Sequence, residues 1–111
     1  MPNKWEIWLV SMPFEDVQEA KPRPALVLDP EGGLILVGKM TSHAPRTEFP
    51  MEYALEEWQG AGLSVPTTLR LSQRVRLGQD RFLKKMGIMQ KKDMVTVSMM
   101  LKKLEHAHAP E

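Results

Sequence analysis

The stretch KPRPALVLDPEGGLILVGKMTSH, residues 21–43, decides the fold of this chain. It begins with a stiff, proline-bracketed segment that leads into an apolar run at residues 25–28, and a second apolar run follows at residues 34–40. Residues 29–33 lie between the two runs and contain a proline with a fixed φ and two glycines that tolerate a positive φ, which is typical of a turn. The stretch therefore predicts two antiparallel strands joined as a hairpin.

Short apolar runs on either side of this hairpin predict further strands. Residues 7–12 end at Pro13, and residues 48–54 and 67–77 are separated by a loop at residues 58–66. Runs of this length, bounded by proline and glycine, are typical of the strands of a small β domain. We therefore expect the first two thirds of the chain to be mainly β.

The last third of the chain changes to a helical period. Asp80 can cap a short helix over residues 81–86, which Gly87 would end. Asp93 can cap a longer helix, in which four apolar residues recur at helical spacing: Met94, Val97, Leu101 and Leu104. We predict a small antiparallel barrel closed by a C-terminal helix, whose apolar seam could also face a second subunit.

Length and composition restrict the class of protein. The 111 residues, 12.7 kDa in mass, predict one domain over residues 1–111. The absence of cysteine excludes disulfides, zinc–thiolate sites, iron–sulfur clusters and a cysteine nucleophile. No apolar run approaches the ~20 residues that cross a bilayer, and a tryptophan and a glutamate within the first six residues argue against a signal peptide. We expect a cytoplasmic protein with no membrane partner.

Charge is divided unevenly along the chain. Residues 1–66 carry five Lys/Arg and ten Asp/Glu (5 − 10 = −5), whereas residues 67–111 carry ten and four (10 − 4 = +6). Such an asymmetry indicates a polyanionic partner, unless folding mixes the two halves on one surface.

Several motifs, taken in order, resemble the PemK/MazF family of toxin ribonucleases. They are KPRPALVL at residues 21–28, KMTSH at 39–43, PTTLRL at 66–71 and KMGIM at 85–89. The resemblance implies an SH3-like or CcdB-like barrel, a homodimer, and metal-independent cleavage of single-stranded RNA without a cofactor. It also implies a small cognate antitoxin that blocks the RNA groove.

The resemblance implies an active site around Arg23 and around Thr41, Ser42 and His43. RNA carries its own nucleophile, the 2′-hydroxyl, so the protein must supply a proton acceptor, a donor for the leaving oxygen and positive charge at the phosphate. An arginine fork binds phosphate bidentately, and the two prolines beside Arg23 restrict its backbone. The alternative is that Arg23 is a surface residue at a strand entrance and His43 an exposed loop histidine.

Two positions depart from the family pattern. The loop between Phe14 and Arg23 is shorter than in the best-known members, and Ser72 stands where many members carry an acidic residue that some use as the general base. Because Ser72 cannot accept a proton at neutral pH, His43 is the nearest candidate base by motif. Water, Glu15 or Asp16 is the alternative.

The sequence also predicts residues that bind the RNA backbone. Arg70, Arg74 and Arg76 have even spacing, so on a continuous strand they would share one face and form either a stripe for RNA phosphates or a solvated edge. Trp5, Trp8 and Phe14 could stack bases, although core packing is the favoured interpretation. The full RNA-binding set that we expect is Lys21, Arg46, Arg70, Ser72, Gln73, Arg74 and Arg76.

The leading hypothesis is an endoribonuclease toxin of a type II toxin–antitoxin module. The alternatives are a CcdB-like inhibitor directed at gyrase and a catalytically inactive barrel that binds RNA. The pair Arg23 and Thr41 favours RNA cleavage, because a topoisomerase poison need not keep them.

Overall fold

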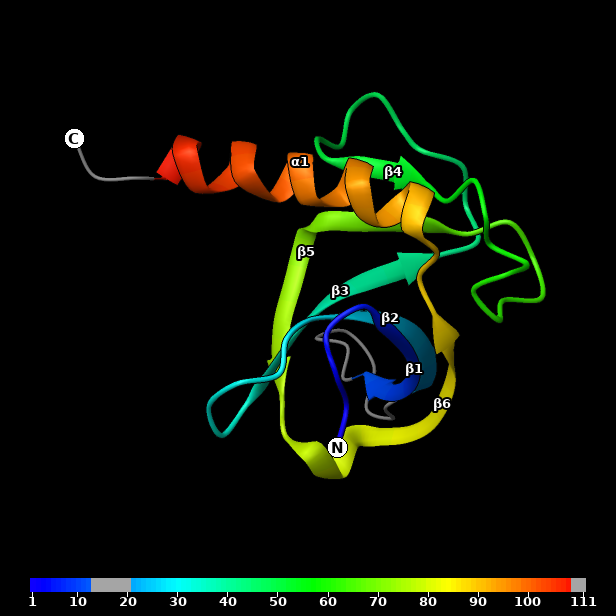
Figure 1. The fold of residues 1–111 in the computed structure, drawn as a ribbon, viewed down its shortest axis with the longest axis vertical. Coiled ribbons are helices and arrows are strands. Elements are labelled where there is room, and N and C mark those ends of the chain that lie inside the picture. The colour runs from blue at the N-terminus through cyan, green and yellow to red at the C-terminus, as the bar shows by residue number, and fades with distance from the viewer. Residues whose placement is uncertain (13–20, 109–111) are drawn as a thin grey trace.

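The computed structural model describes residues 1–12 and 21–108. One short 3₁₀ helix and one α-helix accompany six strands along the chain (Figure 1). In order, the elements are β1 (Glu6–Met12), β2 (Lys21–Asp29), β3 (Ile35–Thr41), β4 (Glu52–Ala54), β5 (Thr68–Leu77), η1 (Gln79–Arg81), β6 (Phe82–Ile88) and α1 (Lys91–His108). The expected mainly β fold with a C-terminal helix is confirmed.

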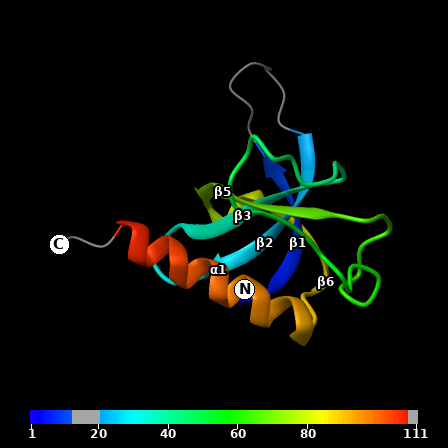
Figure 2. The ribbon, with the colours of Figure 1, turned by 90° about the horizontal axis from the view of Figure 1, so that it is seen from above.

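The strands form a single antiparallel sheet with the order β4-β5-β3-β2-β1-β6. The sheet curls strongly (Figures 1 and 2), but its edge strands β4 and β6 are not paired with each other within the described residues. The sheet itself is therefore open and not a closed barrel, whereas the expected small antiparallel β architecture with a C-terminal helix is present. The hairpin of β2 and β3 is confirmed, and Gly32 supplies the positive φ (+84°) that its turn requires.

The two prolines of β2 lie where the strand has one partner only. Pro22 and Pro24 face Ser11 and Leu9 of β1, whereas the pairing with β3 begins at Ala25. A proline cannot donate to a ladder, so it is tolerated where one side of the strand is unpaired. The segment before Ala25 thus projects beyond β3, which leaves its side chains accessible from that side.

The helix expected over residues 81–86 is wrong, since these residues belong to β6. The capping signal of Asp80 produces only the 3₁₀ turn η1, and the chain then pairs with β1, with Ile7 opposite Gly87 and Trp8 opposite Lys85. Gly87 is not a helix stop. A Cβ at this position would lie 1.9 Å from the Ala61 carbonyl oxygen, so glycine permits close contact between β6 and the loop before β5.

The C-terminal helix α1 packs across one face of the sheet (Figure 2). Its apolar seam is confirmed: Val97 is fully buried, and Met94, Leu101 and Leu104 pack against the same core cluster. Asp93 lies in the first turn and does not cap the helix, because α1 begins two residues earlier at Lys91. In the described part of the chain, no helix is long and apolar enough to cross a membrane.

The core has two parts, one on each face of the sheet. The cluster beneath α1 includes Ile7, Leu26, Leu69 and Met89, and Trp5 packs at its margin. The second cluster occupies the concave side of the sheet, with Trp8 at its margin in edge-to-face contact with Phe82. Both tryptophans are therefore partly buried in the core, which agrees with the favoured interpretation for these two residues.

Candidate functional site

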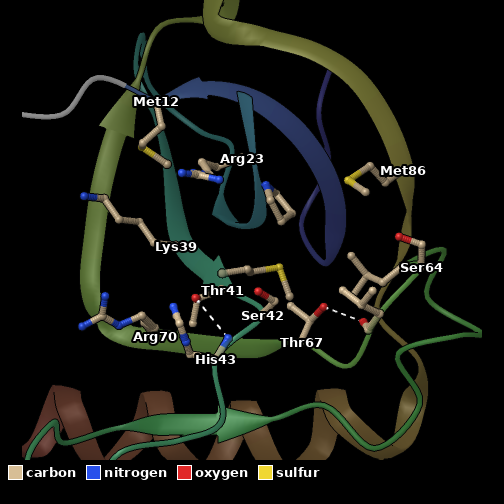
Figure 3. A pocket seen from close by; sticks show the side chains of 14 residues that line it. Met12, Arg23, Lys39, Thr41, Ser42, His43, Ser64, Thr67, Arg70 and Met86 are labelled. Carbon is tan, nitrogen blue, oxygen red and sulfur yellow. Dashed lines mark hydrogen bonds between the residues drawn. The ribbon is translucent and has the colours of Figure 1, made fainter. Parts of the chain in front are cut away.

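A pocket of about 450 Å³ opens where β2 begins and β3 ends (Figure 3). All six strands except β4 contribute to it, as does the loop between β4 and β5. The residues that line it are Met12, Arg23, Pro24, Lys39, Met40, Thr41, Ser42, His43, Leu63, Ser64, Val65, Thr67, Arg70 and Met86.

The four expected catalytic residues all line this pocket. The register of the hairpin explains why: Ala25 faces Lys39, so the residues before Ala25 and after Lys39 lie at the same end of two neighbouring strands. Arg23 precedes Ala25 by two residues, and Thr41 follows Lys39 by two residues. Antiparallel pairing thus brings together two motifs that are separated along the chain.

The end of β3 is fixed by a local hydrogen bond. The backbone N–H of His43 donates to Thr41 Oγ1 over 3.3 Å, so the threonine hydroxyl closes a short turn directly after the strand. Ser42 and His43 are exposed within this turn, whereas Thr41 is half-buried. The turn therefore presents a hydroxyl and an imidazole to the pocket from an anchored backbone.

Three cationic side chains from three adjacent strands line the pocket. Arg23 lies on β2, Lys39 on β3 and Arg70 on β5, with Arg70 opposite Lys39 in the register. No Asp or Glu is found among the described residues that line the pocket. This concentration of positive charge favours an anionic ligand, and arginine in particular suits a phosphate.

The opposite wall is apolar and comes from the loop between β4 and β5. Leu63 and Val65 line it together with Met86 of β6, and Ser64 and Thr67 add hydroxyls (Figure 3). Thr67 Oγ1 donates to the Val65 carbonyl oxygen over 2.9 Å, which holds the loop in shape.

Gly62 lets this loop lie against β6. Its φ is +94°, and a Cβ there would be 2.2 Å from the Met86 carbonyl oxygen. Only glycine combines this backbone conformation with so close an approach. The position of the apolar wall therefore depends on Gly62 together with Gly87.

The buried carboxylate of Asp93 anchors the beginning of the same loop. It accepts hydrogen bonds from the Tyr53 hydroxyl and from the backbone N–H groups of Glu56 (3.0 Å) and Glu57 (2.9 Å). Burial, together with the hydrogen bond to Asp93, raises the pKa of Tyr53 from 10.0 to about 12. Tyr53 thus remains a donor at any physiological pH, and α1 is joined to the loop that leads to the pocket wall.

Of the seven expected RNA-binding residues, the structure brings only Arg70 to the pocket. The strand β5 is not continuous in its pairing: Arg70 faces Lys39 and Arg74 faces Gly38, so three residues of β5 are inserted between adjacent positions of β3. Arg74 lines a separate cavity beside α1, and Arg76 lies 3.9 Å from Asp29. The three arginines therefore do not form one stripe.

The other expected RNA-binding residues lie outside the pocket. Lys21, Arg46 and Ser72 are exposed, and Gln73 is half-buried on β5. Phe14 and the alternative bases Glu15 and Asp16 lie outside the described residues.

The sequence interpretation missed Lys39 and the whole apolar wall. Lys39 stands two residues before Thr41 on the same strand, and this period-two spacing was a signal that could have identified it. The apolar wall had no comparable local signal. It depends on the contact between the loop and β6 that Gly62 and Gly87 permit.

An open antiparallel sheet, one C-terminal helix and a pocket lined by cations and hydroxyls define a small, mainly β protein. The family described as "PemK-like, MazF-like toxin of type II toxin-antitoxin system" matches residues 3–104, and the chain belongs to it. A search of curated proteins returned no match.

Solved structures share the fold at low sequence identity. An endoribonuclease in complex with its cognate antitoxin, from a mycobacterial species, has a TM-score of 0.74 at 14% identity and covers 99% of this chain and 100% of its own. A second mycobacterial endoribonuclease has a TM-score of 0.66 at 12% identity and covers 87% of this chain and 84% of its own.

Proposed function

We propose that this chain is the toxin of a type II toxin–antitoxin module and cleaves single-stranded RNA without a metal. The observation that carries the proposal is the pocket in which Arg23, Thr41 and His43 meet beside Lys39 and Arg70. Membership of the toxin family and likeness in fold to two endoribonucleases support it.

The proposed reaction is attack of the RNA 2′-hydroxyl on the adjacent phosphorus. His43 accepts the proton of the 2′-hydroxyl, the bond from the 2′-oxygen to phosphorus forms, and the bond to the 5′-oxygen breaks. The leaving 5′-oxygen takes up a proton from solvent water, so the products are a 2′,3′-cyclic phosphate and a 5′-hydroxyl. Arg23 stabilises the charge on the phosphorane, while Thr41 and Ser42 position the phosphate and the 2′-oxygen.

The two walls of the pocket suit the two parts of a nucleotide. The cations Arg23, Lys39 and Arg70 would bind phosphates, while Leu63, Val65 and Met86 offer an apolar surface to a base. A base can reach such a surface only when it is unstacked, which favours single-stranded RNA. The hydroxyls of Ser64 and Thr67 would add polar contacts to the base edge.

We infer that the chain has a cognate antitoxin, since one structural neighbour was solved in complex with its own antitoxin. An acidic antitoxin segment that occupies the cationic pocket would exclude RNA by competing for the same charges. The cytoplasm, where single-stranded RNA is available, is the proposed location.

The test is incubation of the purified protein with single-stranded RNA in EDTA. We expect cleavage with 2′,3′-cyclic phosphate ends, and cleavage slower on the order of 10²–10³-fold by a folded Arg23→Ala variant. A gyrase-directed inhibitor would leave the RNA intact and block DNA supercoiling, whereas an inactive binding protein would retain RNA without cutting it. Either of these results would overturn the proposal.

A further inference from the structure

One buried carboxylate adjoins the pocket without lining it. Glu52 begins the edge strand β4, directly opposite Arg70 of β5 in the register. Its side chain is only 3% exposed, although it carries a charge. A buried charge is costly unless it is paired, and so its partners indicate what it holds in place.

The two oxygens of Glu52 hold two different segments of the site. Oε2 accepts a hydrogen bond from Arg70 Nε at 2.7 Å, and Oε1 accepts one from the backbone N–H of Arg46 at 3.1 Å. Arg70 lines the pocket, and Arg46 follows the turn that carries His43 by three residues. A single carboxylate therefore connects a pocket cation to the segment that leaves the turn after β3.

The Phe49 ring adds a second restraint on Arg70. The guanidinium carbon of Arg70 lies 5.0 Å from the ring centroid, and that of Arg46 lies 5.5 Å from it. Both distances are within the range of cation–π attraction. The hydrogen bond to Glu52 uses Nε, and among the described residues neither terminal nitrogen of Arg70 makes a hydrogen bond. The two terminal amino groups remain available for a ligand.

We propose that Glu52 is a positioning residue, whose carboxylate fixes the Arg70 guanidinium and the backbone at Arg46 in the geometry that a scissile RNA phosphate requires. The proposal rests on the RNA cleavage proposed above. Arginine has a long, flexible side chain, and holding it before the ligand arrives removes an entropic cost from the bound state.

The chemistry of the two contacts requires a carboxylate at this position. Both partners of Glu52 are N–H donors, so both side-chain oxygens must accept. In Glu52→Gln one oxygen is replaced by an NH₂ group, which cannot accept a hydrogen bond. The glutamine therefore keeps the shape of the side chain and loses either the Arg70 contact or the Arg46 contact.

The test compares cleavage rates in a double-mutant cycle. We expect Glu52→Gln to lower kcat/KM roughly 10- to 100-fold, since a small misplacement of a positioned group has costs of this size. In an Arg70→Ala background the same change should lower the rate clearly less than in the wild type, because only the contact of Glu52 with the Arg46 backbone N–H then remains. The matched control is Glu56→Gln, which removes the same charge from an exposed ion pair with Lys92 and should leave the rate unchanged.

A purely structural ion pair would give a different pattern. Glu52→Gln would then lower the melting temperature but leave kcat/KM of the folded protein within about twofold of the wild type, which would overturn the proposal. If the double variant does not fold, Arg70→Met can replace Arg70→Ala, because methionine keeps an unbranched side chain but has no N–H for Glu52 to hold. Equal losses from Glu52→Gln in the wild type and in Arg70→Met would also overturn it.

A binding measurement separates this proposal from the proposed function. A short 2′-O-methyl oligoribonucleotide lacks the nucleophile, so its affinity reports binding without cleavage, and a difference between the wild type and Glu52→Gln reports the contribution of Glu52 to that binding. If the wild type cleaves no RNA, the proposed function fails. Weaker binding of the oligonucleotide by Glu52→Gln would still support positioning, whereas an unchanged Kd would overturn it.

Discussion

Arg23 is the side chain on which the proposed chemistry depends most directly. It is exposed on β2 and lines the pocket, so Arg23→Ala should leave the fold intact. If its guanidinium stabilises the phosphorane, the variant should cleave RNA on the order of 10²–10³-fold more slowly. Arg23→Lys should restore only part of the rate, because lysine lacks the bidentate fork. A folded Arg23→Ala protein that cleaves at the wild-type rate would remove Arg23 from the site.

His43 provides a second test at the level of one residue. If its imidazole accepts the proton of the 2′-hydroxyl, His43→Ala should lower the cleavage rate roughly 10²–10⁴-fold. His43→Gln should not restore the rate, because an amide side chain has no basic nitrogen to take up the proton. The measurement is kcat/KM on single-stranded RNA.

The opposite result for His43 is equally informative. If His43→Ala cleaves at the wild-type rate, another group transfers the proton. Glu15 and Asp16 are then the first carboxylates to substitute, and His43 becomes an exposed loop residue.

The part of the candidate site that comes from strand ends was predictable, because recognisable motifs contain Arg23 near the start of β2 and Thr41 at the end of β3. Arg23 and Thr41 meet because the hairpin register is set by the turn between their strands, and the turn residues are visible in the sequence. The apolar wall was not predictable, because Leu63 and Val65 reach the pocket through contacts between segments far apart in the chain. The expectation that Arg74 and Arg76 share one face with Arg70 failed for a related reason. It assumed a continuous strand, and the irregular pairing of β5 has no local signal in the sequence.

At the level of elements, β6 shows how tertiary pairing overrides a local signal. The segment has the local signals of a helix: Asp80 precedes it as a possible N-cap, and Gly87 follows as a possible stop. Lys84, Lys85 and Met86 are also good helix formers. The segment is nevertheless a strand, because β1 offers an unpaired edge and Gly87 must approach Ala61 closely. The hairpin and α1 were predictable because their patterns are set within each segment.

The link between β1 and β6 should be sensitive to acid through Glu6. Burial alone would raise the pKa of Glu6, but hydrogen bonds from Trp8, Asn3 and Lys85, together with the Lys85 charge, outweigh it and lower the pKa from 4.5 to about 2. A pKa depressed in the folded state stabilises the fold above the unfolded value, and this stability is lost as the pH falls from about 4.5 to about 2. The contribution should be on the order of 1–2 kcal/mol, because Lys85 is half-exposed and its charge is screened.

Urea unfolding at pH 7 and at pH 3 measures this contribution. The free energy of unfolding should fall with acid in the wild type and fall less in Glu6→Gln. Glu31→Gln, an exposed substitution in the hairpin turn, should behave as the wild type. Identical acid losses in Glu6→Gln and the wild type would show that Glu6 is not the group responsible.

The attachment of α1 to the loop after β4 should depend on Asp93. Asp93→Ala leaves two backbone N–H groups and the Tyr53 hydroxyl without their acceptor, and it should lower the free energy of unfolding by roughly 2–4 kcal/mol. Tyr53→Phe should cost about 1–2 kcal/mol, since it removes one donor to the carboxylate. Lys92→Ala changes an exposed residue of the same helical turn and should stay within about 0.5 kcal/mol of the wild type. Equal stabilities for Asp93→Ala and Lys92→Ala would contradict this account.

At the scale of the whole molecule, apolar surface remains exposed after the chain has folded. The apolar seam of α1, which we expected to face a second subunit, packs on the sheet of its own chain and is therefore no evidence for a dimer. The evidence for a dimer comes instead from other exposed apolar residues. Leu83 (53% exposed) and Ile88 (44%) lie on β6, and Val95 and Met99 (60% each) lie on the outer face of α1.

The edge strand β6 is the best candidate for an interface with a second copy of the chain. Its outer edge is unpaired within the described residues, and an exposed apolar edge strand promotes pairing with another chain. We therefore predict a homodimer that buries β6, so that sedimentation at micromolar concentration should give a species of two 12.7 kDa chains. Ile88→Glu should shift this species to the monomer, because it places a charge where the interface must be dry, whereas Met99→Glu should leave the dimer intact. Sedimentation of the wild type as a monomer would contradict the prediction, and dissociation by Met99→Glu alone would place the interface on α1.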